Sequence, residues 1–272
     1  MSKQFLLGMN VDTYSPDEIS EGWEFLEVPM GLHLDPFLSN RAYEKWREMY
    51  SRTDIPPVIA ASHFLQGYGL SPATQPPYDE EHLDFWMRRG FQRMAELKIP
   101  VIGIYGGFFT YVDGNDKSRA RKRTLEILNK VADLSKEFGV EVAIEPMAKA
   151  GTVFPSYVDG LAVMEELGRP EIQIMADLNY FLRLEEPLED ILSKPEACLH
   201  VHIQGDGGSQ PNVGDREAIL VNLFTVLKDA NYTRGVSVAC PWKSTLGGDL
   251  DIKKESKITL DYLKKIRDSV YA

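Results

Sequence analysis

Acidic and imidazole side chains stand at the ends of three apolar runs in this chain. Glu145 closes the run EVAIE and is followed at once by Pro146. Asp177 closes IQIMAD, while His200 and His202 alternate within LHVHI. The proline ends a strand and holds Glu145 extended, so a rigid element carries this carboxylate. Carboxylates and imidazoles are ligands for Mg, Mn and Zn ions, and the three runs together predict a metal site.

Two earlier runs end in residues of the same kinds. The run at 23–28 ends at Glu27, and the run at 58–62 is followed by His63. Taken singly, an acid after a strand is also explained by a helix cap or a surface charge. Substrate contact and plain structure explain Glu27 and His63 equally well, and packing explains His200 better than metal binding does. The prediction of a metal site therefore depends on Glu145, Asp177 and His202 together.

Composition narrows the class of protein. The 272 residues are 43% hydrophobic, enough for a substantial core, and an α/β barrel commonly uses about 250 residues in one domain. With 41 acidic and 30 basic residues the net charge is −11, which argues against nucleic acid and anionic membranes as partners. No stretch reaches the roughly 18 apolar residues of a membrane span, and the N-terminal run is too short for a signal peptide. We expect a cytoplasmic protein, and two cysteines are too few for a disulfide framework.

Short β-rich runs alternate with helical patterns along the whole chain. The expected strands are 5–9, 23–28, 58–62, 101–105, 141–147, 172–176, 199–203 and 235–239. Helices are expected to begin at Asp79, Asp116 and Asp215, and a last one carries Ile258 and Ile266. Several strands are almost continuously apolar, as strands buried on both faces are.

This alternation predicts a single (β/α)8 TIM barrel over residues 1–272. A doubly wound open sheet is the alternative, but the segment after the first strand, GMNVDTYSP, lacks the glycine-rich turn that such a fold usually offers to a phosphate. In a barrel, the polar residues at the carboxyl ends of the strands all face one bowl, where such folds place their chemistry.

Several blocks of the sequence resemble the xylose isomerase-like TIM barrels. They are HFLQGYGL, IEP, MADLNYF, LHVHIQGDGGSQPNVGD and YTRGVSVACPW, spread from about Gly22 to Trp242. Their order is similar to that of the sugar phosphate isomerases/epimerases and the ketose 3-epimerases. The resemblance implies one divalent cation (Mn, Mg or Zn) held by a Glu, an Asp, a His and a second Glu, and the first three fall on Glu145, Asp177 and His202. It also implies proton transfer next to a sugar carbonyl, with the two glutamates as acid and base on opposite faces of a cis-enediolate.

The chain departs from that pattern at the eighth strand. Where the resemblance implies VSIE, the chain reads VSVA, so Ala239 stands in the place of the second glutamate. An alanine neither coordinates a cation nor transfers a proton, and we expect an atypical site with three protein ligands. Tyr180 stands where a histidine is implied, and the arginine implied after the seventh strand has no counterpart in GDGGSQP, whereas Pro211 and Asp215 match.

These observations predict an isomerase or epimerase that acts on a ketose or keto-sugar. Glu145 is expected to be both ligand and base, with His63 and Lys243 as further catalytic candidates. The expected substrate contacts are Glu27, His63, Tyr180, and the aromatic residues Phe64 and Trp242 against the apolar face of the sugar. No glycine-rich turn with a neighbouring Lys or Arg follows the last two strands, so nothing supports a phosphate group on the sugar. Homo-oligomerisation is left open.

Four explanations of Ala239 stay open. An enzyme could draw its missing acid or base from Cys240, Lys243, Lys149 or Asp206. A lyase or hydrolase on the same scaffold would need only one base and a Lewis acid. A catalytically inactive sugar-binding barrel would need no base and no Lewis acid. A substitution of the glutamate that was introduced deliberately would give the same sequence. Retention of three candidate ligands favours an enzyme.

Overall fold

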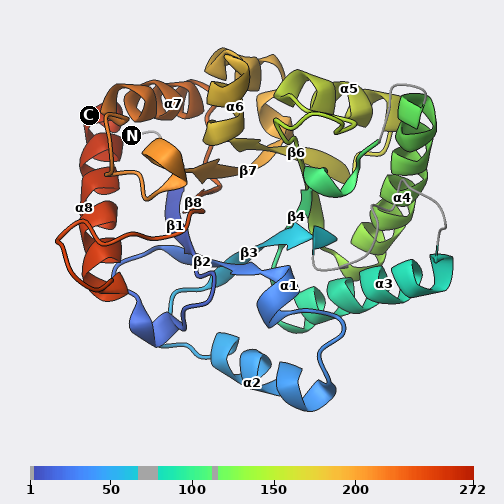
Figure 1. The fold of residues 1–272 in the computed structure, drawn as a ribbon, viewed down its shortest axis with the longest axis horizontal. Coiled ribbons are helices and arrows are strands. Elements are labelled where there is room, and N and C mark those ends of the chain that lie inside the picture. Colours follow the sequence, from blue (N-terminus) through green and yellow to red (C-terminus); the bar gives the residue numbers. More distant parts are fainter. Residues whose placement is uncertain (1–2, 67–78, 112–115) are drawn as a thin grey trace.

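Eight parallel strands close into one barrel in a computed structural model that describes residues 3–66, 79–111 and 116–272 (Figure 1). Each strand pairs with the next in sequence order, and the last pairs back to the first. The strands are β1 (Leu6–Asn10), β2 (Phe25–Pro29), β3 (Val58–Phe64), β4 (Val101–Tyr105), β5 (Glu141–Glu145), β6 (Ile172–Asp177), β7 (Cys198–Ile203) and β8 (Gly235–Val238). The barrel prediction is confirmed, and the pairing of β1 with β8 excludes an open sheet. The part of the block HFLQGYGL beyond Gln66 lies outside the described residues.

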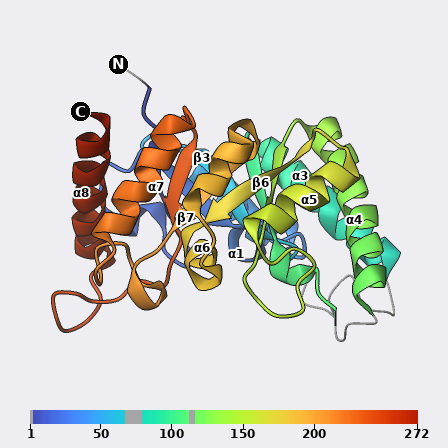
Figure 2. The same ribbon diagram turned by 90° about the horizontal axis from the view of Figure 1, so that it is seen from above.

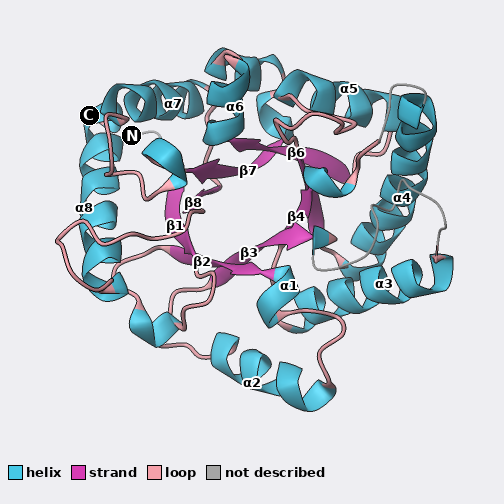
Figure 3. Ribbon diagram, in the orientation of Figure 1, coloured by secondary structure: helices cyan, strands magenta, loops and turns pink. Residues whose placement is uncertain are grey.

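Helices form an outer ring around the strands (Figure 3). They are α1 (Met30–His33), α2 (Asn40–Tyr50), α3 (Glu80–Glu96), α4 (Lys117–Phe138), α5 (Tyr157–Leu167), α6 (Leu178–Leu184), α7 (Glu217–Asp229) and α8 (Ile252–Tyr271), with short 3-10 turns η1 (Pro16–Glu18), η3 (Gly106–Phe108), η5 (Leu188–Ser193), η6 (Pro195–Ala197) and η7 (Asp206–Gly208). Apolar periodicity did not predict α1 and α2. None of the helices in the described ranges is both long and apolar enough to cross a membrane.

Two of the three predicted helix starts are confirmed. Asp79 is the N-cap of α3 and accepts a hydrogen bond from the backbone N–H of His82 at 3.0 Å, and Asp116 is the N-cap of α4. The prediction for Asp215 is wrong, because α7 begins after Arg216. The carboxylate of Asp206 accepts the Asp215 N–H at 3.1 Å and pairs with the Arg216 guanidinium, so these contacts hold the turn before the helix.

The barrel interior is apolar at mid-height and polar at the carboxyl ends of the strands. A small cluster separate from the main core consists of Ala60, Val101, Ala143, Met175 and Leu199. Side chains alternate across a strand, so residues two positions further along also face inward. Glu145 follows Ala143 by two positions, and Asp177 follows Met175 in the same way. The alternation of side chains along the strands therefore places both carboxylates inside the barrel, nearer to the carboxyl ends of the strands than this apolar cluster.

Phe25 fills the interior beside β1 and β8. A Cβ at Gly8 would lie 2.2 Å from its ring, and one at Gly235 would lie 2.7 Å from it, so both positions need glycine to leave room. The ring centroid of Phe25 lies 6.0 Å from that of His200. Phe25 thus supports the polar residues of β7 from below.

The two ends of the barrel differ in their loops. In Figure 2 the C-terminus and the start of the chain lie at one end, and the long loops that follow β5, β7 and β8 lie at the other. The carboxyl ends of the strands open toward these loops, as in other barrels that carry a site at this end.

Candidate functional site

Glu145, Asp177 and His202 lie together at the ends of β5, β6 and β7. Nδ1 of His202 lies 3.5 Å from Oε1 of Glu145 and 3.8 Å from Oδ2 of Asp177. Asp177 and His202 are direct partners in the register of β6 and β7. One ligand atom from each residue lies within 4.8 Å of the others, and all three side chains are buried. The structure brings together the three predicted ligands, which we call the triad, and their role as ligands stays a prediction.

The three triad side chains perturb one another's titration. Burial acts to lower the pKa of His202, but the charges of Glu27 and Glu145 and their hydrogen bonds hold it well above its ordinary value. Burial, and next the charge of Glu145, raise the pKa of Asp177 to about 7. Oε2 of Glu145 is buried and has no hydrogen-bond partner among the described residues. An unpaired buried carboxylate oxygen is costly, and a cation would remove that cost. Two carboxylates and an imidazole form a donor set that suits Mg, Mn or Zn, so these residues fit a divalent cation.

Glu27 lies on the side of the His202 ring opposite to Glu145. Its side chain is 1% exposed, and it accepts hydrogen bonds from Nε2 of His202 at 2.8 Å and Nε2 of His200 at 3.1 Å. Burial acts to raise the pKa of Glu27, but the charges of the two histidines and their hydrogen bonds hold it well below its ordinary value. The structure thus gives the Glu27 carboxylate two histidine partners, and a contact of Glu27 with a substrate stays a prediction.

The contact with Glu27 selects the nitrogen that His202 presents to the triad. A carboxylate only accepts hydrogen bonds, so Nε2 of His202 carries a hydrogen and Nδ1 is the atom left for a cation. A carboxylate on the far nitrogen commonly orients a histidine that binds metal. Glu27, His200 and His202 also lie within 4.8 Å of one another, but their hydrogen bonds explain this group without a second cation.

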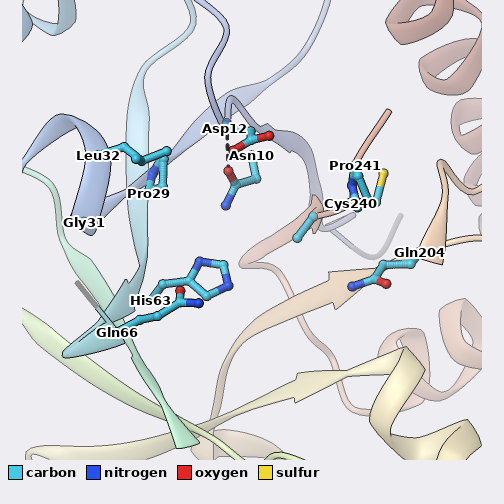
Figure 4. A pocket seen from close by; sticks show the side chains of 11 residues that line it. Asn10, Asp12, Pro29, Gly31, Leu32, His63, Gln66, Gln204, Cys240 and Pro241 are labelled. Atoms are coloured by element: carbon cyan, nitrogen blue, oxygen red, sulfur yellow. Dashed lines mark hydrogen bonds between the residues drawn. The ribbon is translucent and has the colours of Figure 1, made fainter. Parts of the chain in front are cut away.

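A cavity of about 550 Å³ opens at the carboxyl ends of the strands, and none of its described lining residues belongs to the triad (Figure 4). Its polar lining among the described residues comes from Asn10, Asp12, His63, Gln66 and Gln204. Ala239 also lines this cavity and offers it only a methyl group. Sequence reasoning missed Asn10 and the two glutamines. The only signal for Asn10 was a polar residue at the end of the first apolar run.

His63 stands between the cavity and the triad. It lines the cavity, and its ring centroid lies 6.4 Å from that of His202. Its φ is +59°, in the left-handed region, and the pairing of β3 with β4 shifts register between Ala61 and Phe64. Such a bulge re-aims a side chain, and here it turns the ring toward the cavity in Figure 4. The predicted role of His63 as a catalytic and substrate-contacting residue stays a prediction.

The side chain of Phe64 points away from the cavity that His63 lines. Its side chain is fully buried, with ring centroids 4.8 Å from Trp86 and 5.5 Å from Phe91, both on α3. It therefore packs between the barrel and a helix. This placement corrects the expectation that Phe64 lines the sugar.

Three further predicted residues, Tyr180, Trp242 and Lys243, have different surroundings. Burial, followed by the charges of Glu145 and Asp177, raises the pKa of Tyr180, so a protonated phenol lies near the triad carboxylates. Trp242 is 7% exposed and belongs to the apolar core, and its stacking on a sugar stays a prediction. Lys243 is exposed, and its backbone N–H and C=O bond the side chain of Gln210.

The other candidates for a missing acid or base have different surroundings. Cys240 lines the cavity, but burial raises the pKa of its thiol to about 12, so it keeps its proton. Asp206 is occupied by Arg216 and the Asp215 N–H. Lys149 is exposed.

Comparisons with known proteins agree with this architecture. Residues 20–266 match the family model described as xylose isomerase-like TIM barrel. The D-psicose 3-epimerase of Agrobacterium fabrum (strain C58) is 24% identical over 193 residues, and the match spans 68% of this chain and 65% of that enzyme, less than two thirds of its length.

Solved structures of two epimerases superpose on nearly the whole chain. The 3-keto-D-glucoside 4-epimerase of E. coli gives a TM-score of 0.74 at 19% identity, covering 96% of this chain and 100% of that one. A D-psicose 3-epimerase crystallised in the presence of D-fructose gives 0.77 at 17% identity, covering 97% and 99%. At these identities the likeness shows a shared fold.

Proposed function

The chain belongs to the xylose isomerase-like TIM barrel family, and on that ground we propose that it is a divalent-metal-dependent isomerase or epimerase of a ketose or keto-sugar. The observation that carries the proposal is the buried triad of Glu145, Asp177 and His202, with one carboxylate oxygen that has no described partner. The cavity at the carboxyl ends of the strands gives a sugar a place to bind.

The triad would hold the cation, and Ala239 would add no ligand to it. When bound, the cation supplies a Lewis acid that stabilises negative charge on a sugar oxygen. Glu145 would also serve as the base that removes a proton from the carbon beside the carbonyl. Glu27 would keep the His202 ring in place from behind.

The described lining of the cavity favours an uncharged sugar. It offers carboxamide, imidazole and carboxylate groups, and the described part of that lining contains no lysine or arginine to bind a phosphate. Leu32 and Pro29 provide an apolar wall on another side, as sugar sites commonly do. D-psicose and a 3-keto-D-glucoside, the sugars in the names of two similar proteins, belong to this class and are the first substrates to try.

A lyase on the same scaffold is a second candidate, and Ala239 is the observation that favours it. Elimination of water from a keto-sugar needs one base beside a Lewis acid, and the triad with Glu145 supplies both.

Solvent exchange tests the proposal without knowledge of the product. We would incubate the protein in D2O with D-fructose, D-tagatose, D-psicose or a methyl 3-keto-D-glucoside, with Mn2+ or with EDTA. We expect metal-dependent uptake of deuterium at the carbon beside the carbonyl for at least one sugar, and loss of that uptake in Glu145→Gln. A new unsaturated product would favour the lyase, and the absence of both exchange and elimination would overturn the proposal.

A further inference from the structure

We propose that His63 is the second proton-transfer residue of this site and completes an epimerase in which Glu145 is the first. This inference rests on the proposed function and goes beyond it, because it commits the site to inversion at carbon by two groups. Ala239 itself offers the cavity only a methyl group, so a second proton-transfer group must come from another residue of the lining.

Few side chains in the cavity lining could be the second proton-transfer residue. Among its described residues, the side chains that can exchange a proton are Asp12, His63 and Cys240. The thiol of Cys240 keeps its proton because it is buried. The ring centroid of His63 lies 6.4 Å from that of His202, one residue of the triad. An imidazole can both give and take a proton near neutral pH, as reversible epimerisation requires.

A chain of hydrogen bonds runs along the strand ends to the ring of His63. The backbone N–H of Asp12 donates to Oδ1 of Asn10 at 3.0 Å, so the amide nitrogen of Asn10 is turned the other way. That nitrogen donates to Oγ of Ser62 at 2.8 Å. Oγ of Ser62 lies 2.9 Å from Nδ1 of His63. Figure 4 shows the Asn10 amide above the His63 ring, which points into the cavity.

This chain makes Nε2 of His63 the atom at which protons enter and leave. Because Ser62 already accepts from Asn10, its own hydroxyl hydrogen can donate to Nδ1 of the neutral ring, which leaves the ring hydrogen on Nε2. In the protonated ring, Nδ1 carries a hydrogen and donates to the second lone pair of the Ser62 oxygen. A hydroxyl partner therefore serves both states of the ring, whereas a carboxylate would favour only the protonated one.

The backbone of β3 is distorted at this residue. A φ of +59° is uncommon for a residue with a side chain, and it coincides with the register shift between Ala61 and Phe64. Strained residues of this kind persist where the surrounding structure holds them, and they cluster at functional sites. Here the distortion lets His63 face the cavity beside Ser62, whereas Phe64 packs against α3.

The proposed step balances in atoms and electrons. Glu145 takes the proton from the carbon beside the carbonyl, the electron pair of that C–H bond forms a carbon–carbon double bond, and the carbonyl π pair moves to oxygen as an enediolate. Protonated His63 gives its Nε2 proton to the opposite face of the same carbon, and the oxygen pair returns to the carbonyl. Glu145 has gained a proton and His63 has lost one. Exchange with solvent then restores both groups.

The test separates proton removal from inversion. We would compare wild type, His63→Gln and the matched control His82→Gln on α3 in D2O with Mn2+, using D-fructose, D-tagatose and D-psicose as probes. We expect His63→Gln to lose inversion by about 100-fold or more, as loss of a general acid does, while deuterium still enters the unchanged sugar through Glu145. The control should behave as wild type, and both variants should still bind Mn2+, because neither residue belongs to the triad.

Three results would count against His63. Inversion by His63→Gln at the wild-type rate would overturn the assignment, and so would an equal loss of exchange and inversion, which a structural role produces. A wild type that exchanges no proton in any probe would overturn the proposed function and this inference with it.

Ser62 acts through His63 and is a positioning residue. Its role is therefore tested by a measurement on the His63 ring and not by activity alone. Long-range 1H–15N NMR of the metal-free protein should show the His63 ring protonated on Nε2 when neutral. Ser62→Ala should shift the ring toward the other tautomer, and Ser62→Thr, which keeps the hydroxyl, should restore it. Identical His63 spectra in wild type and Ser62→Ala would contradict the relay.

Discussion

Nε2 of His202 lies 2.8 Å from Oε1 of Glu27, on the side of the ring away from the triad carboxylates. Glu27 is on β2 and His202 on β7, so this contact crosses the interior of the barrel. It sets which nitrogen faces Glu145 and Asp177. The metal site proposed here therefore depends on a carboxylate outside the triad.

Glu27→Gln should weaken metal binding and leave the fold intact. Glutamine keeps the size of the side chain but loses the charge that holds the two histidines, and loss of such an outer partner typically costs about 10- to 100-fold in metal affinity. Mn2+ titration by calorimetry measures the effect. Glu137→Gln, on the exposed surface of α4, is the matched control and should bind as wild type does. Equal affinities of wild type and Glu27→Gln would show that Glu27 has no such role.

Metal-free protein should lose stability as pH rises toward neutrality. The pKa of Asp177 is raised to about 7 in the folded protein, against about 3.9 in an unfolded chain, so the folded state binds this proton more tightly. Its contribution to stability is complete below the unfolded value and is lost as pH rises through the folded value. Thermal unfolding between pH 5 and 8 should show this decline, and Asp177→Asn should flatten it. A decline of equal slope in Asp177→Asn would assign it to another group.

Metal affinity should change with pH in the opposite direction. A cation competes with the proton on Asp177 and with the proton that the raised pKa of His202 keeps on its ring, so Mn2+ binding should strengthen as pH rises through 7. Below that pH, binding should release a proton, which calorimetry in two buffers of different ionisation enthalpy detects. Affinity that is flat from pH 5.5 to 7.5 would mean that no triad carboxylate is protonated in that range.

Ala239→Glu should tighten metal binding. Position 239 lines the cavity, so a longer side chain has open space, and a further carboxylate oxygen suits the same cations. We expect Mn2+ affinity to rise by about tenfold or more, whereas Ala239→Gln, of the same size without the charge, should gain much less. Equal gains in the two variants would point to packing and not to coordination.

Gly8→Ala should destabilise the barrel, because the new Cβ would lie 2.2 Å from the ring of Phe25. Overpacking of this kind costs about 1–3 kcal/mol, which urea unfolding can measure. Phe25→Leu in the same protein should recover part of the loss by removing the ring. If the double variant is no more stable than Gly8→Ala, the clash with Phe25 is not the cause.

Local patterns were enough to predict the barrel and the triad. Each strand gives a short apolar run, and Glu145, Asp177 and His202 are polar residues at the ends of such runs, so period two and chain order place them at one end of a closed barrel. No observed strand bound differs from its predicted bound by more than two residues.

Contacts between distant strands could not be predicted in the same way. The partner of Glu27 is 175 residues away, and only the closed barrel brings the two together. Strict alternation after Ala60 and Ser62 would also put Phe64 inside the barrel. The bulge reverses that order, and a bulge has no clear signal in this sequence.

A Mn2+ titration of wild type, Asp177→Asn and the surface control Asp133→Asn tests the central claim most directly. Asp133 pairs with Arg169 on the outside of the protein and lies outside the triad. The account predicts one Mn2+ per chain for wild type and Asp133→Asn, with affinity lower by more than about 100-fold in Asp177→Asn. Binding of equal strength in all three proteins, or no binding by wild type, would contradict a metal site at Glu145, Asp177 and His202.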